Sequence, residues 1–345
     1  MRYIGSKTWC LEKLLQLVLR EVPNAKSLCD PFAGTCTVAR FFKLNRFRVT
    51  TGDLLSLSYA FQVAGVCLNK PLMFKKLLRH LGHAPDINQA LQTVLSHLND
   101  LPRHAGWVTR NYSLAGTARR KFFTVSNAEH LDAILLAIKK WSRTGLICRT
   151  ERWYLLACTL EAADRVANTA GTYYAYLNTF YRKARRPLAI RPIEVFNNGY
   201  RNVVRCADAE KTVRSTATDV LYLDPPYNQR DYGAYYHLPD LLVSGQTPRV
   251  TGRSGRPRQP TNRSPFCSKS TARDALNRVL QTADARLIIL HYAEQGIIQH
   301  QDILTMMREL GPTYSLIWKS RAYTSSPTSP KLPQFRTRLY VCHPT

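Results

Sequence analysis

Four consecutive residues, Asp224, Pro225, Pro226 and Tyr227, place a carboxylate, two prolines and a phenol ring directly after the apolar run DVLYL. Two prolines after a buried strand end its hydrogen bonding, which leaves carbonyl oxygens without local donors. A carboxylate and a free carbonyl can both accept from one exocyclic amine, and an aromatic ring can stack on the base that carries it. The pattern therefore indicates chemistry at a nucleobase amino group. A structural turn with Asp224 as a helix cap is the alternative.

A second pattern lies near the start of the chain, where the segment DPFAGTC (residues 30–36) follows the strand-like run SLCD. In an open parallel sheet the ligand binds at the carboxyl ends of the strands, and a glycine in the first turn lets the backbone approach it. Asp53 ends the next strand, 23 residues after Asp30, close to the separation of about 20 at which a carboxylate binds both ribose hydroxyls. The pattern predicts a site for an adenosine-containing cofactor. An ordinary turn with a solvent-facing acid is the alternative.

The glycine motifs that bind pyrophosphate are missing from this chain. Neither G-x-G-x-x-G nor G-x-x-x-x-G-K-[ST] occurs in it, so dinucleotides and nucleoside triphosphates are disfavoured as cofactors. A cofactor with a nucleoside but no phosphate needs fewer glycines, and S-adenosylmethionine (SAM) is such a cofactor.

The elements that must position these residues follow from hydrophobic periodicity. A helical pattern begins at Thr8 and stops at Pro23, and apolar side chains recur at helical spacing within residues 87–98, 131–141 and 156–166. Short apolar runs predict strands, two of them before residue 60 and five after residue 200, in residues 27–30, 46–53, 202–208, 219–224, 286–292, 314–318 and 338–342. This order predicts an α/β sheet interrupted by a helical insertion.

The charge of the chain is unusual, with 49 Lys and Arg against 23 Asp and Glu and a formal net charge of +26. Such an excess favours a polyanionic partner, and nucleic acid is the first candidate. No run approaches the roughly 20 apolar residues that span a bilayer, so we expect no membrane association. The opening MRYIGSKTWC has no apolar export segment, which predicts a cytoplasmic protein. Nine scattered cysteines without a CxxC pair predict reduced thiols and no metal site.

Three basic segments are candidates for contact with a nucleic acid. One is RNYSLAGTARRKFF (residues 110–123), and a second combines the basic residues of 182–191 with the aromatic residues of 173–181. The third, residues 244–273, carries seven basic residues and no acid, and its Gly, Pro and Ser content predicts a mobile loop. Solvated charge without a binding role is the alternative for each segment.

Together these motifs resemble the DNA adenine N6-methyltransferases of the Dam type, and the resemblance covers nearly the whole chain. YIGSK (residues 3–7) is similar to the family segment that closes over the methionine part of the cofactor, DPFAGTC resembles its FxGxG motif, and residues 224–227 resemble its catalytic DPPY tetrad. The resemblance implies catalytic roles for Asp224, Pro225, Pro226 and Tyr227. It implies SAM binding by Tyr3, Lys7, Asp30, Phe32, Gly34, Asp53, Asp208 and Asp224, with no metal.

The resemblance also implies a fold and a division into domains. We expect an α/β, Rossmann-like SAM-dependent methyltransferase with a mixed seven-stranded sheet, formed by residues 1–60 and 195–345. We expect a helical target-recognition insertion at residues 61–194. Two departures from the family pattern are Cys36, which replaces the second glycine of FxGxG, and HYAEQG (residues 291–296), which stands where the family often has SYN.

The implied activity is site-specific methylation of adenine N6 in double-stranded DNA, as in restriction-modification systems. A companion restriction endonuclease is left open. Three alternatives also stay open: methylation of cytosine N4, methylation of adenine N6 in RNA, and a catalytically silent DNA-binding relative.

Overall fold

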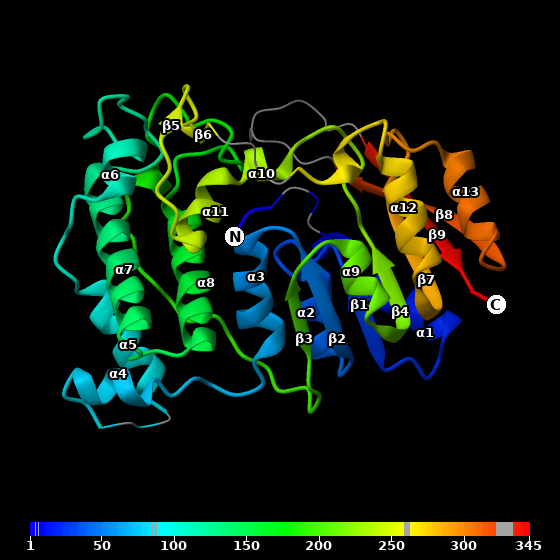
Figure 1. Cartoon of the computed structure of the whole chain (residues 1–345), viewed down its shortest axis with the longest axis horizontal. Helices are drawn as coiled ribbons and strands as arrows, with labels where there is room; N and C mark the ends of the chain where they lie inside the picture. The colour runs from blue at the N-terminus through cyan, green and yellow to red at the C-terminus, as the bar shows by residue number, and fades with distance from the viewer. Residues whose placement is uncertain (4, 6, 85, 87, 259–262, 322–333) are drawn as a thin grey trace. The chain divides into compact units, whose positions relative to one another are not determined.

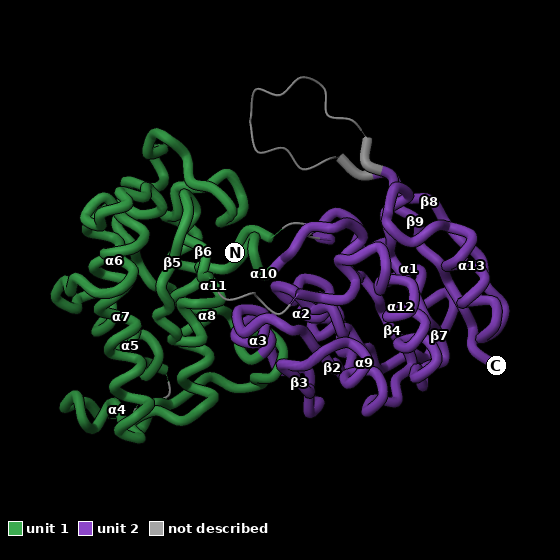
Figure 2. Tube along the Cα trace, turned by 45° about the horizontal axis from the view of Figure 1, so that its top comes forward, with its two compact units in different colours: residues 1–3, 63–195, 233–261 green, residues 4–62, 196–232, 262–345 purple. Residues whose placement is uncertain are grey.

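The computed structural model describes residues 1–3, 5, 7–84, 86, 88–258, 263–321 and 334–345. Positions 4 and 6 of the YIGSK segment, position 87 of the predicted helical region and residues 259–262 of the acid-free basic segment lie outside the described residues. The chain folds into two compact units, one of residues 1–3, 63–195 and 233–261 (unit 1) and one of residues 4–62, 196–232 and 262–345 (unit 2) (Figure 2).

Unit 2 is an α/β layer structure around one sheet. Its strands are β1 (Ser27–Asp30), β2 (Arg48–Asp53), β3 (Val203–Cys206), β4 (Ala217–Leu223), β7 (Asp284–Ala293), β8 (Thr313–Arg321) and β9 (Gln334–Cys342). Its helices are η1 (Thr8–Cys10), α1 (Leu11–Glu21), α2 (Thr37–Leu44), α3 (Ser56–Gln62), α9 (Ala209–Arg214), η4 (Pro265–Cys267), α12 (Ala272–Gln281) and α13 (His300–Arg308). Each of the seven predicted strands is present.

The sheet of unit 2 has the order β3-β2-β1-β4-β7-β9-β8 (Figure 1). Strands β3, β2, β1, β4 and β7 are parallel, whereas β9 is antiparallel to both β7 and β8. The predicted mixed seven-stranded sheet is therefore confirmed. The strand order reverses direction between β1 and β4, and the carboxyl ends of the strands at such a reversal are where open α/β sheets bind ligands.

The packing of the sheet follows from the alternation of its side chains. Cys29, Leu221 and Ile288 point to the face where α9, α12 and α13 supply the apolar residues of one continuous core. Their neighbours along the strands point to the other face. There the buried His291 ring lies edge-on to Trp9, with ring centroids 6.2 Å apart. Both faces are covered, which explains why the parallel strands are apolar on both sides.

Unit 1 is mainly helical. Its elements are η2 (Val63–Cys67, a π-helical turn), α4 (Lys75–His80), α5 (Ala90–Asn99), α6 (Trp107–Tyr112), α7 (Val125–Arg143), α8 (Arg149–Val166), η3 (Arg182–Arg185), α11 (His237–Ser244), β5 (Val250–Thr251) and β6 (Arg256–Pro257), and α10 (Tyr232–Tyr235) begins at its boundary. The long helices α7 and α8 pack against each other, and α6 and α11 pack on α7 and α8 respectively. Thr124 and Cys148 cap the amino ends of α7 and α8 through their side chains.

The units begin and end close to the predicted domain bounds, at residues 62–63 and 195–196. The main difference is that residues 233–261, which we expected in the catalytic domain, pack with the helical unit. The acid-free basic segment is also more structured than its composition predicts, since it contains the β5–β6 hairpin, η4 and the start of α12. Among the described residues, no helix is both long and apolar enough to cross a bilayer.

Candidate active site

The carboxyl edge of the parallel strands in unit 2 gathers the acids that the sequence singled out. Asp30 is the last residue of β1, Asp53 is the last residue of β2, and Asp224 directly follows β4. Because β1 lies between β2 and β4 and is parallel to both, these three carboxylates meet at one edge of the sheet. The predicted acids of the cofactor and catalytic motifs are thus brought together within one unit.

Asp224 forms an ion pair with Lys7. The Lys7 ammonium donates to the Asp224 carboxylate and, at 3.0 Å, to the carbonyl oxygen of Gly5. Lys7 is 7% exposed and the Asp224 side chain 21% exposed, so the pair is largely shielded from water. Burial raises the pKa of Asp224, and the Lys7 charge opposes that rise. The sequence predicted Lys7 as a cofactor contact, and the structure pairs it with Asp224, the acid of the tetrad.

Asp30 is the most perturbed of the three acids. Burial, followed by the negative charge of Asp224, raises the pKa of Asp30 to about 8. Its carboxyl group accepts the Phe32 backbone N–H at 3.3 Å, which partly offsets the rise. At neutral pH the Asp30 carboxyl is therefore largely protonated and can donate a hydrogen bond as well as accept one.

Asp53, at the end of β2, is hydrogen-bonded to the glycine-containing turn. Its carboxylate accepts the Gly34 N–H at 2.9 Å and the Leu55 N–H at 3.0 Å. Gly34 has a φ of 51°, a left-handed conformation that glycine adopts without steric cost. Burial raises the pKa of Asp53 despite these hydrogen bonds. A carboxylate has about four acceptor positions, and two of them take these backbone N–H groups.

The backbone and ring of Tyr227 are both held in place. The Tyr227 carbonyl oxygen accepts the Ile297 N–H at 3.0 Å, and its ring packs edge-on to Tyr292, with centroids 6.4 Å apart. Within the part of the chain that the structure describes, no hydrogen bond reaches the Pro225 carbonyl oxygen. An acid, an unpaired carbonyl and a half-buried ring therefore follow β4 in succession, as the tetrad predicted.

Two supporting aromatic residues were not singled out in the sequence. Phe266 of η4 packs edge-on to Phe32, with ring centroids 5.0 Å apart, and Tyr292 supports Tyr227. Phe266 lies in the segment that we expected to be a mobile loop, so its role had no sequence signal. The packing of Tyr292 does have a sequence signal, which is the glycine at position 296. A Cβ at Gly296 would lie 2.1 Å from the Tyr292 ring, so a larger side chain does not fit there. The Tyr292 hydroxyl also accepts the Ile298 N–H at 3.3 Å.

Two predicted cofactor residues are placed differently from the rest. Asp208 caps helix α9 by accepting the Lys211 N–H at 2.8 Å, and its side chain is 39% exposed. This capping role alone accounts for an acid at that position. Tyr3 belongs to unit 1, where its ring stacks on Tyr236 with centroids 4.5 Å apart. Cofactor contact by Asp208 and Tyr3 stays a prediction.

The two departures from the family pattern have local structural explanations. Cys36 is fully buried and adopts a φ of 62°, so it takes the left-handed conformation that a glycine would take there. His291 is buried in the sheet between the Tyr222 hydroxyl at 3.1 Å and the Thr337 hydroxyl at 2.9 Å. Burial lowers its pKa well below the usual value, so the ring is neutral. His291 is therefore part of the sheet core.

The charge balance of this edge suits a cationic ligand. Asp30, Asp53 and Asp224 lie close enough for the charges of Asp224 and Asp53 to raise the pKa of Asp30, and Lys7 is the cation that offsets them. SAM carries a sulfonium, an ammonium and a carboxylate group, and its net positive charge would favour the ionised forms of these acids. The residues present therefore fit this cofactor.

The fold and the acids at its carboxyl edge define a methyltransferase of the α/β class. A model of the D12 class N6 adenine-specific DNA methyltransferase family matches residues 3–306. The chain belongs to this family, and the predicted Dam-type resemblance is confirmed.

Several type II modification enzymes are similar in sequence. The type II methyltransferase M.NlaIII of Neisseria lactamica is 33% identical over 92% of this chain and 90% of that protein. The type II methyltransferase M.FokI of Planomicrobium okeanokoites is 31% identical and the modification methylase StsI of Streptococcus sanguinis is 30% identical, each over 90% of this chain. The matches cover 47% and 46% of those two proteins, so the chain spans about half their length.

Proposed function

We propose that this chain transfers a methyl group from SAM to the N6 amino group of adenine in double-stranded DNA. The observation that carries the proposal is the succession after β4 of the Asp224 carboxylate, the unpaired Pro225 carbonyl and the Tyr227 ring. Family membership supports adenine as the acceptor. These groups lie at the strand ends where open α/β sheets bind their ligands.

The reaction requires three contributions from the protein, which are stacking of the base, hydrogen bonding to the amine and uptake of a proton. The adenine leaves the duplex stack, and the Tyr227 ring, which packs edge-on to Tyr292, supplies a stacking surface for it. Asp224 and the Pro225 carbonyl accept the two N6 protons as hydrogen bonds, which favours the pyramidal nitrogen that has an available lone pair. The new C–N bond forms as the methyl–sulfur bond breaks with its electron pair left on sulfur, and one N6 proton is lost. Asp224 can take it up, because burial raises the pKa of this carboxylate.

SAM supplies an activated methyl group on sulfur, so no further activation of the leaving group is needed. Asp53 would accept hydrogen bonds from its ribose hydroxyls, Phe32 and the Gly34 backbone would line the site, and the protonated Asp30 could donate to it. Lys7 would oppose the rise in the pKa of Asp224 that burial causes. The proline that follows Pro225, Pro226, would keep the turn rigid. Positioning of the reactants accounts for most of the expected acceleration.

The relatives named as type II enzymes support a role in DNA modification. We infer that this methylation blocks cleavage by an endonuclease that recognises the same sequence, and that the enzyme works in the cytoplasm, on DNA. The helices of unit 1 would provide target recognition.

The decisive experiment expresses the chain in a host that lacks DNA methylation. Nucleoside mass spectrometry of host DNA and RNA, with methylation-sensitive sequencing, should detect N6-methyladenine in DNA and report its sequence context. Asp224→Asn should lower methyl transfer by roughly 10²- to 10⁴-fold, the contribution typical of a positioned proton acceptor. Asp284→Asn is the matched control, because Asp284 is exposed at the amino end of β7.

Each other outcome contradicts part of the proposal. N4-methylcytosine in DNA, or methylated adenine in RNA, would assign a different acceptor to the same site. A chain that binds SAM and DNA but methylates neither would be a silent relative. Full activity of Asp224→Asn would remove the tetrad from the reaction.

A further inference from the structure

Two segments of unit 1 with little regular structure of their own lie side by side. One is the β5–β6 hairpin, and the other is the loop of residues 168–181. The hairpin ladder has two residue pairs, Val250 with Pro257 and Thr251 with Arg256. A ladder this short is not stable alone, so other contacts must fix the conformation of the hairpin.

Buried side chains from unit 1 fix the hairpin through its backbone carbonyls. The Tyr112 hydroxyl donates to the Gly255 carbonyl at 2.6 Å, and the Arg120 guanidinium donates to the Gly252 carbonyl at 2.9 Å. Tyr112 is fully buried and Arg120 is 5% exposed. Two further anchors are the Trp107 indole N–H, which donates to the Pro248 carbonyl at 3.2 Å, and the His237 ring, 3.0 Å from the Ser254 carbonyl.

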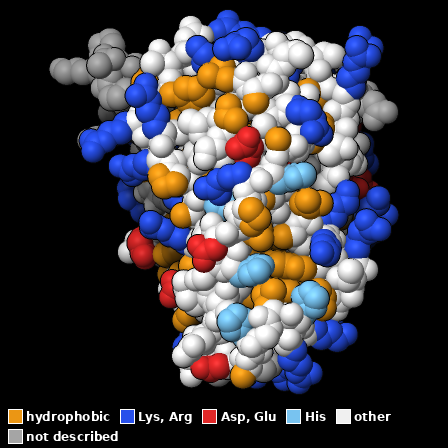
Figure 3. Space-filling view, turned by 90° about the vertical axis from the view of Figure 1, so that its left-hand side faces the viewer, with side chains coloured by type: hydrophobic (Ala, Val, Ile, Leu, Met, Phe, Trp, Pro, Cys, Tyr) orange, Lys and Arg blue, Asp and Glu red, His pale blue; other side chains and the backbone are white. Residues whose placement is uncertain are grey.

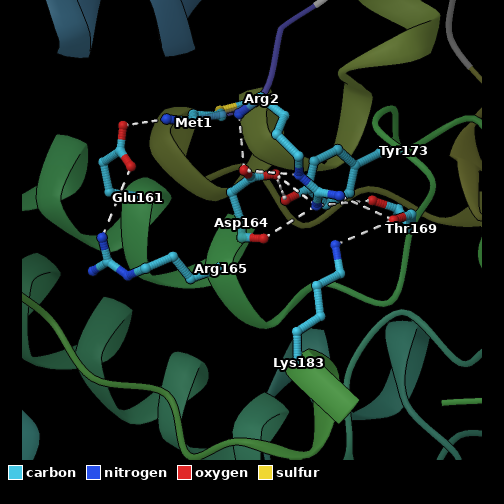
Figure 4. Close-up of polar contacts among 8 residues, drawn as sticks. All are labelled: Met1, Arg2, Glu161, Asp164, Arg165, Thr169, Tyr173 and Lys183. Carbon is cyan, nitrogen blue, oxygen red and sulfur yellow. Dashed lines mark hydrogen bonds and ion pairs between the residues drawn. The ribbon is translucent and has the colours of Figure 1, made fainter. Parts of the chain in front are cut away.

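The 168–181 loop is fixed in a similar way. The side-chain amide of buried Asn168 donates to the Lys121 and Leu177 carbonyls at 3.0 and 2.9 Å, and its oxygen accepts the Tyr181 N–H. At the start of the loop, Arg2 binds both the Asp164 carboxylate, at 3.1 Å, and the Thr169 carbonyl, at 3.0 Å (Figure 4). In the same cluster the Tyr173 hydroxyl donates to the Asp164 carboxylate at 3.4 Å and the Lys183 ammonium donates to the Thr169 carbonyl at 3.4 Å. These contacts hold the base of the loop.

The two fixed segments present arginines on tyrosine rings. The Arg253 guanidinium lies over the Tyr176 ring, 5.7 Å from its centroid, and donates to Asn178 Oδ1 at 2.7 Å. The Arg256 guanidinium lies over the Tyr174 ring at 5.4 Å. A guanidinium that rests on a ring keeps its in-plane N–H donors available for phosphate.

Tyr174 extends this surface with an exposed aromatic face. Its side chain is 48% exposed, and its ring stacks on Tyr235 with centroids 5.1 Å apart and an interplanar angle of 23°. The Tyr173 N–H donates to the Tyr235 carbonyl at 2.8 Å, which fixes the backbone beneath the stack. We call the four residues Tyr174, Tyr176, Arg253 and Arg256 the arginine–tyrosine surface.

The charged side chains of the hairpin segment beside this surface are all basic. Arg249, Arg253, Arg256 and Arg258 are exposed, and the sequence has no acid between residues 244 and 273. Basic side chains also lie around the margin of the face shown in Figure 3, where acidic side chains are few. Positive charge alone therefore does not single out a binding surface. The distinguishing feature here is that buried groups hold the exposed arginines in one geometry before any ligand binds.

We propose that the arginine–tyrosine surface binds phosphate groups of the DNA backbone, with Arg253 and Arg256 each contacting one phosphate. This inference rests on the proposed function for its partner, DNA. It assigns binding to a segment that follows the catalytic tetrad in the sequence, outside the region of residues 61–194 where we expected target recognition. Backbone contacts of this kind set the position of a protein on DNA and do not read its sequence.

The test measures DNA affinity of the full chain by fluorescence anisotropy between 50 and 200 mM salt, with duplexes that do and do not contain the methylated sequence. Replacing both arginines by alanine (Arg253→Ala with Arg256→Ala) should weaken binding to both duplexes by roughly tenfold per arginine. The slope of log affinity against log salt should become shallower by about 1.8, since each phosphate contact contributes about 0.9.

Two matched variants control the measurement. Arg253→Lys with Arg256→Lys keeps both charges and should retain the salt slope of the parent chain. Lys139→Ala with Lys140→Ala removes two exposed charges from α7 of the same unit and should change affinity much less. Thermal melting should show that all three double variants remain folded.

The inference is overturned if the alanine variant binds with unchanged affinity and salt slope, or if the α7 variant loses as much affinity. It is also overturned if affinity falls only for the duplex with the methylated sequence, because that result would indicate base reading. Failure of the proposed function would look different, since the parent chain would then methylate no DNA at all.

Discussion

The Lys7 ammonium is the ion-pair partner of the Asp224 carboxylate, so the acid that should hold the adenine amine is already bound by a lysine 217 residues away in the sequence. The pair does two things at once. It opposes the rise in the pKa of Asp224 that burial causes, and it occupies one acceptor position of the carboxylate. In the proposed reaction the adenine amine would bind Asp224 beside the Lys7 contact, at another acceptor position of the carboxylate.

Removal of the Lys7 charge should affect both stability and the pH dependence of the reaction. Because Lys7 opposes the rise in the pKa of Asp224, Lys7→Met should raise that pKa further and shift the acidic limb of the rate profile to higher pH. The free energy of unfolding should fall by about 2 to 3 kcal/mol, less than for a fully buried pair, because Asp224 is partly exposed. Lys7→Arg keeps the charge and should stay near the parent. An unchanged pH profile in Lys7→Met would show that the pair does not tune Asp224.

Asp30 should make the protein less stable as the pH rises. Its pKa is about 8 in the folded chain and near the ordinary value of about 4 when unfolded, so the folded state holds a proton that the unfolded state has lost between these values. The stabilisation from this group is complete below about pH 4 and is lost as the pH rises toward 8. Its slope is at most about 1.4 kcal/mol per pH unit.

Asp30→Asn should remove this slope, because an amide does not titrate. Urea unfolding of the parent and the variant at pH 5, 6 and 7 would measure it. Asp284→Asn, at an exposed site, should leave the slope unchanged and serves as the control. If the free energy of unfolding changed with pH equally in the parent and in Asp30→Asn, the result would argue against a protonated Asp30.

Cys36 allows a direct measure of backbone strain next to the cofactor turn. At a φ of 62° a side chain costs roughly 1 to 2 kcal/mol, part of which is balanced by the greater freedom of glycine in the unfolded chain. Cys36→Gly and Cys36→Ala both lose the buried sulfur, so their difference combines the strain with the burial of one methyl group, which favours alanine by roughly 0.8 kcal/mol. We expect the glycine variant to be the more stable by about 0.5 to 1 kcal/mol in urea unfolding. It should also bind SAM more tightly, which isothermal titration calorimetry would detect. An alanine variant more stable than the glycine variant by the roughly 0.8 kcal/mol of its buried methyl group would mean that this turn carries no strain.

Tyr227 should contribute through its ring and not through its hydroxyl. Tyr227→Phe keeps the stacking surface and the edge contact with Tyr292, so kcat/KM for DNA should stay within a few-fold of the parent. Tyr227→Ala removes a stacking interaction worth about 1 to 3 kcal/mol, and kcat/KM should fall by roughly 5- to 150-fold. Steady-state kinetics with a single-site duplex would separate the two. Equal losses in both variants would assign the role to the hydroxyl.

The parts of the fold that the sequence predicts well are those in which local pattern and burial agree. The strands that end at Asp30 and Asp53 are short apolar runs next to turns, and the tetrad follows a third such run, so their positions at one sheet edge follow from parallel pairing. The Lys7–Asp224 pair could not be predicted in this way. Its partners are brought together by the tertiary fold, which no local pattern encodes.

The β5–β6 hairpin is the clearest feature that the sequence did not reveal. A stretch rich in Arg, Gly and Pro predicts a mobile loop, and its local sequence indeed lacks the means to hold a hairpin. The anchors come from Tyr112 and Arg120, 143 and 132 residues before the carbonyls they bind. The same long-range packing explains why residues 233–261 pack with the helical unit.

The chain passes between its two units five times, after residues 3, 62, 195, 232 and 261, and this has a consequence for biosynthesis. Strand β1 pairs with β4, which is synthesised almost 190 residues later. At ribosomal rates, synthesis of the intervening chain takes about 10 to 40 s. Throughout that interval the nascent polypeptide carries an apolar strand with an open edge. Production of the enzyme at high levels should therefore depend on chaperone capacity, and slower translation at lower temperature should raise the yield of correctly assembled protein.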